Sequence, residues 1–326
     1  MRILVTGAAG YVGSVVTQRL VEQGHDVIAM DNLSHGFRQA VHEDAVFEKG
    51  DLLDADWLGD LLARRPVEAV VHLAAEARID DSLRDPGLFY RANVVGGIHL
   101  LDAMASAGVR RIVFSSTAAV YGQPERMPIT EDAPLEPVNA YGESKLVFER
   151  ALSWYARAHG LRYVALRYFN VCGATERFGE ARRRETHIIP LLFDVVQGRR
   201  EGFRLFGSDY DTPDGTCIRD YIHVSDIAKA HLLALAAIDR IGAGLYNMGN
   251  GNGFSNMEVI ETVRRVTGGE IPVAPADRRP GDPEQLVAGS DKIRRELLWE
   301  PDYPKLDPMV DSAWQWRLAH PEGYGE

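Results

Sequence analysis

The sequence predicts an α/β fold in which a doubly wound parallel sheet is followed by a smaller mixed α/β domain. Short β-branched and aliphatic runs alternate with helical patterns up to about residue 170, which is typical of parallel strands joined by helices. The first of these runs ends in a glycine turn, and the second ends in an acidic residue. After residue 170, glycine, proline and charged residues become dense and the helical patterns become shorter.

The first strand, turn and helix form a unit that is suited to an anionic ligand. Residues 2–6 predict a strand, and a turn with three glycines follows it. These glycines are Gly7, Gly10 and Gly13, after which apolar residues recur at helical spacing up to Gly24. The N–H groups of such a turn and of the helix N-terminus can hold a pyrophosphate.

The second strand, at 26–31, ends in Asp31, roughly 20 residues past the glycines. Its carboxylate would accept hydrogen bonds from an adenosine ribose and would repel a 2′-phosphate, which favours NAD over NADP. The glycine spacing differs from the common G-x-G-x-x-G because the second glycine lies one place later. The flanking strands and the acid nevertheless indicate a Rossmann-type, NAD-binding unit rather than a simple loop.

The alternation continues along the chain. Further strands are predicted at 45–48, 69–73, 111–115 and 163–169, and helices from about residue 54, at 86–107 and at 141–158. The second half predicts helices at 224–238, 256–267, 291–297 and 308–320. We therefore expect one domain over 1–170 and a second over 171–326, some segments of which return to the first domain.

The composition excludes several classes of protein. A net charge of −11 and a pI near 5.4 argue against nucleic acid or an anionic membrane as the main partner. The two cysteines, Cys172 and Cys217, do not make a disulfide scaffold, and the ten histidines show no metal-ligand spacing, so we expect no metal. The longest apolar stretch, around 232–238, falls far short of the roughly 20 residues that span a bilayer. We expect a soluble, cytoplasmic protein.

Tyr141 and Lys145 lie four residues apart at the start of a predicted helix, so their side chains share one face. A nearby positive charge lowers the pKa of a tyrosine and can make it a general base near neutral pH. Thr117 follows the strand at 111–115, where side chains that face a substrate are expected. Taken singly, these residues are also typical of a solvated helix face and a strand cap. Together on a dinucleotide fold, they indicate chemistry.

With these motifs, the chain resembles the extended short-chain dehydrogenase/reductase family, and within it the UDP-glucose 4-epimerases. The resemblance covers essentially the whole chain in order. The matching motifs are Gly7-x-x-Gly10-x-x-Gly13, Asp31-Asn-Leu-Ser34, Gly50-Asp51-Leu52, His72-Leu-Ala-Ala75, Asn93, Ser115–Gly122, Tyr141-x-x-x-Lys145, Arg167–Asn170, Phe206–Thr216, Cys217–His223, Tyr246-Asn247 and Arg278–Asp282.

The resemblance implies a reaction without net oxidation. The Tyr141 phenolate would take the proton of the sugar 4-hydroxyl while C4 gives a hydride to NAD, and the 4-keto sugar would turn over before the hydride returns to its other face. Lys145 would hold the nicotinamide ribose and, with the nicotinamide ring, lower the pKa of Tyr141. Thr117 would hydrogen-bond the 4-oxygen.

The resemblance also implies the binding residues. Besides Thr117, Tyr141 and Lys145 as catalytic residues, those for NAD would be Gly7, Gly10, Tyr11, Val12, Gly13, Asp31, Asn32, Ser34, Gly36, Asp51, Leu52, Leu73, Ala74, Ala75, Asn93, Ser115, Tyr141, Lys145 and Tyr168. Those for the UDP-sugar would be Thr117, Tyr141, Asn170, His187, Ile188, Leu205, Phe206, Arg219, Arg279, Asp282 and Leu286. A homodimer through helices near 86–107 and 142–158 is implied in the same way.

Several alternatives stay open. Ala118 and Ala119 replace an acid pair of related dehydratases, which favours epimerisation over loss of water. Leu286 takes the place of a bulkier tyrosine in some epimerases, so UDP-N-acetylglucosamine is an alternative substrate, and UDP-glucuronate is another. A non-catalytic NAD-binding scaffold is the alternative from a different class. The run 182–184 of three arginines is most simply a solvated loop, with a phosphate lid as the alternative.

Overall fold

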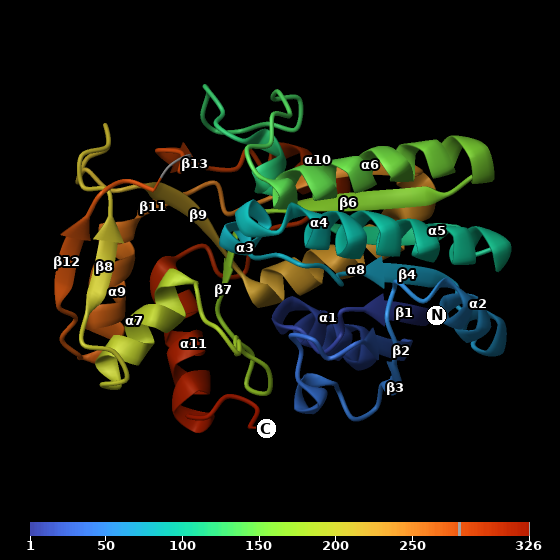
Figure 1. Cartoon of the computed structure of the whole chain (residues 1–326), viewed down its shortest axis with the longest axis horizontal. Coiled ribbons are helices and arrows are strands. Elements are labelled where there is room, and N and C mark those ends of the chain that lie inside the picture. Colours follow the sequence, from blue (N-terminus) through green and yellow to red (C-terminus); the bar gives the residue numbers. More distant parts are fainter. Residues whose placement is uncertain (280–281, 326) are drawn as a thin grey trace.

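The centre of the molecule is a seven-stranded sheet whose strands are all parallel (Figure 1). A computed structural model describes residues 1–279 and 282–325. The strand order is β10-β6-β5-β4-β1-β2-β3, which confirms the predicted doubly wound parallel sheet. The strands are β1 (Arg2–Thr6), β2 (Asp26–Asp31), β3 (Val46–Lys49), β4 (Ala69–His72), β5 (Arg111–Thr117), β6 (Arg162–Tyr168) and β10 (Ala243–Met248).

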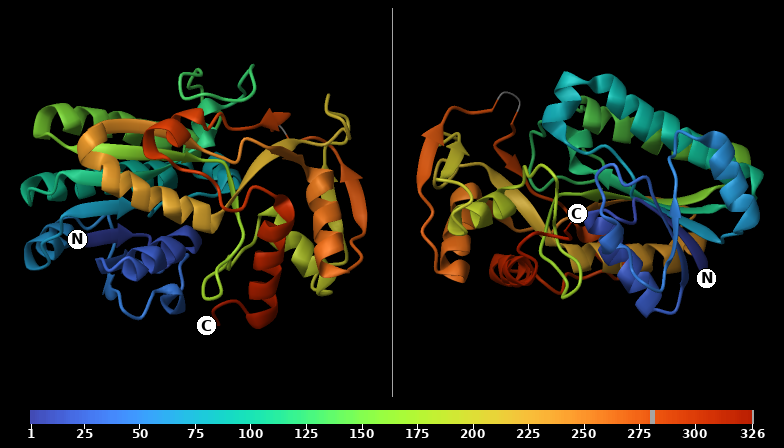
Figure 2. Two further views of the ribbon diagram at one scale, coloured as in Figure 1. Left: turned by 180° about the vertical axis from the view of Figure 1, so that it is seen from behind. Right: turned by 60° about the horizontal axis from the view of Figure 1, so that its bottom comes forward.

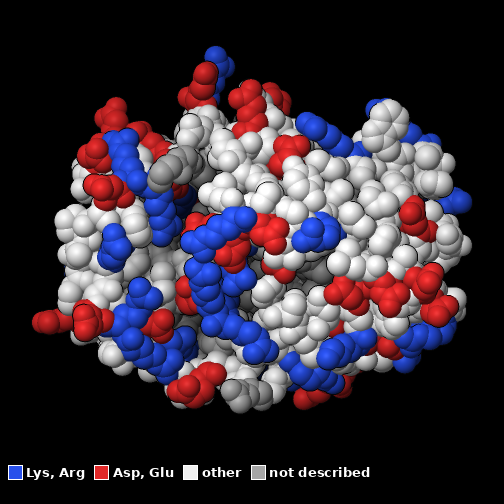
Figure 3. Space-filling view, viewed as in Figure 1, with Lys and Arg blue, Asp and Glu red and all other residues white. Residues whose placement is uncertain are grey.

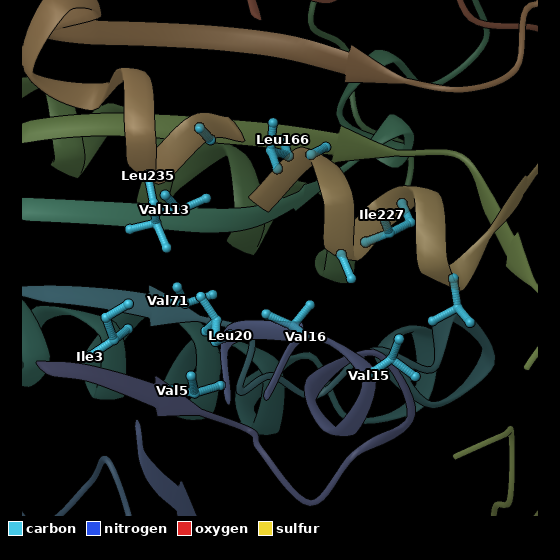
Figure 4. Packing of buried hydrophobic residues seen from close by; sticks show 14 of the residues in the cluster. Ile3, Val5, Val15, Val16, Leu20, Val71, Val113, Leu166, Ile227 and Leu235 are labelled. Carbon is cyan, nitrogen blue, oxygen red and sulfur yellow. The ribbon is translucent and has the colours of Figure 1, made fainter. Parts of the chain in front are cut away.

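Apolar side chains alternate between the two faces of this sheet, as the strand period of two requires. On β1, Ile3 and Val5 belong to one buried cluster and Leu4 belongs to the other. The first cluster lies under α1 (Tyr11–Glu22) and α8 (Val224–Ile241), as Figure 4 shows. The second lies under α2 (Ala55–Arg64), α5 (Gly96–Ser106) and α6 (Ala140–His159). Figure 2 shows α8 crossing the sheet on the face opposite α5 and α6.

The predicted helix at 86–107 is divided in the structure. It consists of α4 (Pro86–Phe89), a π-helical segment η2 (Tyr90–Val95) and α5. The π segment turns Asn93 inward, where its amide bonds the Glu76 backbone and the Ser144 hydroxyl. A short helix that the sequence does not predict, α3 (Ile79–Arg84), precedes it. Its only buried residue is Ser82, so it leaves no apolar pattern in the sequence.

The rest of the chain forms a smaller region with its own core, in which α7, α9 and α11 pack together. Its elements are β7 (Asn170–Cys172), α7 (Ile188–Val196), β8 (Phe203–Phe206), β9 (Ile218–His223), β11 (Gly253–Ser255), α9 (Asn256–Thr267), β12 (Val273–Ala276), β13 (Gln285–Leu286) and α11 (Leu306–Ala319). β10 pairs with β6 in the large sheet, and α10 (Asp291–Leu297) contacts α8 and β10. The chain therefore leaves the first sheet after β6 and returns to it. The boundary at residue 170 stays a prediction.

A buried ion pair joins α6 to the sheet. Arg167 on β6 and Glu149 on α6 lie 2.7 Å apart, and their side chains are 1% and 4% exposed. The Ser116 hydroxyl donates to the same carboxylate at 2.5 Å. Arg167 also donates to the hydroxyl of Tyr121, which donates to Asn247 on β10. This network links three neighbouring strands to the helix that carries Tyr141 and Lys145.

Within the described residues, none of the helices combines the length and the apolar character that crossing a bilayer requires.

Arg167→Gln should destabilise the protein strongly, because it leaves the Glu149 carboxylate buried without its charged partner. Loss of one member of such a pair costs about 3–5 kcal/mol. Arg162→Gln on the same strand is the matched control, because Arg162 pairs with Asp239 at the surface, where ion pairs contribute little. Urea denaturation of both variants measures the difference. Equal stabilities would show that the buried pair does not hold α6 in place.

Candidate active site

A large cavity opens along the carboxyl ends of the parallel strands and continues into the smaller region. Its volume of about 1090 Å³ exceeds the 300–1,000 Å³ that is usual for one small-molecule ligand. One end lies at the switch point of the sheet, where β1 has β2 on one side and β4 on the other. On the face shown in Figure 3, the hollow lies beside a band of lysine and arginine side chains.

The glycine turn lies at this switch point and is tightly packed. Gly7 has a φ of +73°, a conformation that side chains rarely adopt. A Cβ on Gly13 would lie 2.0 Å from the Gly7 carbonyl oxygen, and a Cβ on Gly7 would lie 2.6 Å from the backbone nitrogen of Ala74. The turn therefore accepts only glycine at these positions. It exposes the N-terminus of α1, whose first N–H groups have no partner within the helix and can bind an anion.

Asp31 ends β2 beside this turn. Its carboxylate accepts hydrogen bonds from the backbone N–H groups of Ala9 at 3.0 Å and Leu33 at 2.7 Å. Burial raises the pKa of Asp31, and these two hydrogen bonds lower it. Each oxygen keeps a second acceptor position for a ribose hydroxyl. The tight glycine turn, the free N–H groups of α1 and this acid fit the pyrophosphate and adenosine ribose of NAD.

The three predicted catalytic side chains line one wall of the cavity. Thr117 ends β5, and Tyr141 and Lys145 lie in the first two turns of α6. Asn139 caps this helix by accepting a hydrogen bond from the Gly142 N–H at 2.8 Å. Lys145 is 3% exposed and donates to the Ser115 carbonyl oxygen at 2.8 Å. The end of β5 thus positions Thr117, the Asn139 cap positions the start of α6 with Tyr141, and the hydrogen bond to Ser115 positions Lys145.

The prediction that Lys145, together with the nicotinamide ring, lowers the pKa of Tyr141 stays a prediction. Burial raises the pKa of Tyr141, and the groups that lower it are the Thr117 hydroxyl and the Arg182 guanidinium. Burial also lowers the pKa of Lys145 to about 7, against a smaller raising effect of Glu149. Desolvation is the cause of the lowered pKa of Lys145, and its hydrogen bond to the Ser115 carbonyl oxygen holds the side chain in place.

The other end of the cavity carries the groups predicted for a nucleotide. Arg219 pairs with Asp282 at 2.5 Å, and both line the cavity. The Arg279 guanidinium lies 4.2 Å from the centre of the Phe206 ring, over its face. Leu205, the residue before Phe206, is buried. Planar cations, a carboxylate and an aromatic face together suit a diphosphate, a ribose and a base. Pro280 and Gly281 of the matching motif lie outside the described residues.

The structure brings most of the predicted residues into this cavity. Those that line it are Gly7, Gly10, Tyr11, Val12, Gly13, Leu73, Ala75, Ser115, Thr117, Tyr141, Lys145, Tyr168, Asn170, His187, Ile188, Leu205, Phe206, Arg219, Arg279, Asp282 and Leu286. Those outside its lining are Asp31, Asn32, Ser34, Gly36, Asp51, Leu52, Ala74 and Asn93. Asp31 and Gly36 pack against the glycine turn at Ala9, and Asn93 supports Glu76 in the loop after β4.

The cavity also holds two acidic residues that lie outside the predicted set, Glu180 and Glu185, next to the predicted His187. Glu180, Glu185 and His187 bring three ligand-type atoms within 4.8 Å of one another among the described residues. Arg182 and His187 both contact the Glu180 carboxylate, at 2.8 and 2.7 Å. The interpretation of 182–184 as a solvated loop is wrong for Arg182, whose side chain lines the cavity and is 27% exposed. The polar sequence around Arg182 does not indicate that its side chain is partly buried. That burial depends on residues that are distant in the sequence and line the same cavity.

Such a cavity is typical of dinucleotide-dependent enzymes of the short-chain dehydrogenase/reductase type. Comparison with known proteins narrows this class. The model of the "NAD dependent epimerase/dehydratase family" matches residues 3–249. The chain belongs to this family.

Full-length relatives agree. A UDP-glucose 4-epimerase of Lacticaseibacillus casei is 45% identical, over 100% of this chain and 99% of that protein. A crystal structure of a UDP-glucose 4-epimerase superposes with a TM-score of 0.97 at 46% identity, over 100% of both chains. A UDP-glucose 4-epimerase of Bifidobacterium longum in complex with NAD+ and UDP gives a TM-score of 0.94 at 35% identity, over 99% of this chain and 100% of that one.

Gly13→Ala should prevent the chain from holding NAD, because the new methyl group would meet the backbone of the glycine turn and no side chain could move to relieve it. The measurement is the NAD content of the purified protein, by absorbance and enzymatic assay after denaturation. Gly59→Ala is the control, since Gly59 lies in α2 with nothing within 4 Å of an added Cβ. NAD retained by Gly13→Ala would contradict the assigned pyrophosphate site.

Proposed function

We propose that the protein interconverts UDP-glucose and UDP-galactose by inverting C4 of the hexose through a 4-keto intermediate, with NAD tightly bound throughout. The observation that carries the proposal is that one cavity joins a glycine turn, the set of Thr117, Tyr141 and Lys145, and an arginine-rich nucleotide end. The family and the full-length relatives support the same reaction.

In the proposed reaction, each of the three residues has a separate role. NAD, held at the turn of Gly7, Gly10 and Gly13, would supply reversible hydride transfer at C4 of the sugar. Tyr141 takes the proton of the 4-hydroxyl and gives it back, so one residue serves both directions. Thr117 lines the same wall of the cavity as Tyr141. Its hydroxyl can hold the 4-oxygen while the bond between C4 and this oxygen changes from single to double. Lys145 can donate to the ribose next to the nicotinamide.

The nucleotide end has to anchor the substrate while the sugar turns. Arg219 and Arg279 can contact the diphosphate, and Phe206 offers a face for the uracil. Arg219 pairs with Asp282, and in the proposed complex phosphate oxygens would replace this partner of the arginine while a ribose hydroxyl donates to the carboxylate. The guanidinium keeps an anionic partner before and after binding, while the carboxylate exchanges the arginine for a neutral hydroxyl donor. This exchange suits a protein whose overall charge of −11 would repel an anion.

The wall around Thr117 argues against elimination of water. Ala118 and Ala119 follow the threonine and line the cavity, and neither can donate a proton to a leaving hydroxyl. The alternative of a non-catalytic scaffold is less well supported, because a scaffold needs no buried lysine with a tyrosine on the same wall of the cavity.

We also propose a homodimer through α5 and α6. Tyr90 and Val95 are the first and last residues of η2, which leads into α5, and Trp154 lies on α6; they are 40%, 43% and 64% exposed, and apolar side chains that gather on one face suit an interface. The dimer and the cytoplasmic location stay predictions. The sedimentation mass of the protein in solution tests the first.

Tyr141→Phe should abolish interconversion of UDP-glucose and UDP-galactose while NAD stays bound, because it removes the proton acceptor and keeps the ring. The expected loss in kcat is at least about 10²–10⁴-fold. Tyr155→Phe on the same helix is the control, since its hydroxyl bonds only Asp102 among the described contacts and faces away from the cavity. Proton NMR of the anomeric signals measures turnover. Inactivity of the unaltered protein would favour the scaffold.

The side chain of Leu286 suggests a second substrate. It lines the cavity at a position where some epimerases have a bulkier tyrosine. We expect room for the N-acetyl group, so that UDP-N-acetylglucosamine is inverted as well. The same NMR assay, with UDP-N-acetylglucosamine and UDP-glucuronate supplied separately, measures this. Conversion of UDP-glucose with UDP-N-acetylglucosamine untouched would contradict the expectation, and inversion of UDP-glucuronate would extend the specificity to acidic sugars.

A further inference from the structure

Two loops flank the glycine turn after β1. The β2 loop (32–37) follows β2, and the β4 loop (73–78) follows β4. β2 and β4 are the two neighbours of β1 in the sheet, so their backbones lie roughly 10 Å apart with β1 between them. The crevice between the two loops is the switch point, where a dinucleotide binds in sheets of this kind. Asp31, the acceptor for the adenosine ribose, directly precedes the β2 loop.

Both loops pack against the turn. On one side, the Phe37 N–H donates to the Ala9 carbonyl oxygen at 3.0 Å, and a Cβ on Gly36 would lie 2.8 Å from Ala9. On the other side, a Cβ on Gly7 would lie 2.6 Å from the backbone nitrogen of Ala74. The turn therefore holds the base of each loop in place.

One side-chain contact joins the two loops across the end of β1. The His35 Nε2 lies 2.8 and 3.0 Å from the two carboxylate oxygens of Glu76. Such a hydrogen bond needs a hydrogen on Nε2, which both the imidazolium and one neutral tautomer supply. The His35 side chain is 48% exposed and the Glu76 side chain 13%, so the imidazole forms the outer part of the contact. Like Asp31, both residues lie outside the lining of the large cavity.

We propose that His35 and Glu76 form a clasp across the adenosine end of the NAD site, and that this clasp has to open before NAD can leave. The inference deepens the proposed function and rests on it for its purpose. In the proposed reaction one NAD molecule both accepts and returns the hydride, so loss of the reduced cofactor would end a cycle before product forms. A clasp that slows this loss keeps each cycle complete.

The Glu76 side of the clasp is fixed by the helix that carries Tyr141. Asn93 holds the Glu76 backbone twice, accepting from its N–H at 2.8 Å and donating to its carbonyl oxygen at 2.9 Å. The same amide group donates to the Ser144 hydroxyl at 2.9 Å, and this hydroxyl donates to the Tyr141 carbonyl oxygen at 2.7 Å. The Glu76 side chain therefore starts from a fixed backbone, which reduces the entropy lost when it contacts His35.

The His35 side of the clasp is tied to the ribose acceptor. The Asp31 carboxylate accepts from the Leu33 N–H at 2.7 Å, and the Asn32 side chain accepts from the Ser34 N–H at 2.9 Å. Two such turns in succession fix the chain that leads to His35. Burial raises the pKa of Asp31, whereas its two backbone hydrogen bonds and then the charge of His35 lower it, which agrees with an imidazole beside the ribose site.

The test is the rate at which the purified protein releases its NAD. Protein that holds radiolabelled NAD is mixed with an excess of unlabelled NAD, and the label that stays bound is measured over time. His35→Ala and Glu76→Ala should each speed the release about two- to fivefold, the range expected from a partly exposed ion pair. The double variant should release NAD no faster than either single variant, because the two residues act through one contact.

Arg2→Gln is the matched control. Arg2 pairs with Asp26 at 2.6 Å, and this half-exposed pair joins β1 and β2 at the opposite ends of these strands. Its loss should leave the release of NAD unchanged. Melting temperatures show whether all of the variants are folded.

Several outcomes would overturn the clasp. One is an unchanged release in both single variants. Another is additivity in the double variant, which would show that His35 or Glu76 contacts NAD on its own. Faster uptake with slower release would show that the pair occupies the place of the adenosine rather than covering it. A wild-type protein that holds no NAD would overturn the NAD site as well.

The release of NAD is measured without a UDP-sugar, so its outcome does not depend on epimerisation. A separate assay tests the purpose of the clasp: during turnover, His35→Ala and Glu76→Ala should lose activity progressively, and added NAD should restore it. Stable activity despite faster release would support the clasp and overturn its role in the cycle. Faster release in a protein inactive on every UDP-sugar would support the clasp and refute the proposed function.

Discussion

The pair of Glu149 and Arg167 is the constraint on which the site depends. It is almost fully buried, and one carboxylate receives both the guanidinium and the Ser116 hydroxyl at the end of β5. Because Glu149 lies one turn after Lys145 on α6, the pair fixes the rotation of that helix relative to the strand that carries Thr117. A buried pair contributes little net stability, but it is specific about geometry. The positions of Tyr141 and Lys145 relative to Thr117 depend on this geometry.

Much of the fold could be predicted from the sequence, because period-two strands and amphipathic helices leave patterns in adjacent residues. β1, β2 and α9 begin and end where these patterns do. The π segment at 90–95 and the short α3 could not be predicted in this way. The first depends on the Asn93 amide finding partners in two distant segments, and the second buries a serine rather than an apolar stripe.

The site shows the same division. Gly13 could be found from the sequence because its role is local: its neighbour in space is the Gly7 carbonyl, six residues away. Arg182 could not, because its burial arises from Glu180 and from a sheet built from the other end of the chain. The electrostatics of Tyr141 are likewise a property of the closed cavity. Spacing on a helix shows that Lys145 is near Tyr141, but not how strongly it is desolvated.

The return of β10 to the large sheet has a consequence for biosynthesis. Until β10 has left the ribosome, β6 is an open edge, and until α8 has left it, only α1 covers that face of the sheet. During synthesis, the first six strands of the sheet therefore expose unpaired backbone groups on β6 and some aliphatic side chains. Such surfaces favour aggregation and are the kind that chaperones bind. The first sheet therefore gains its last strand only after the chain has entered and left the smaller region.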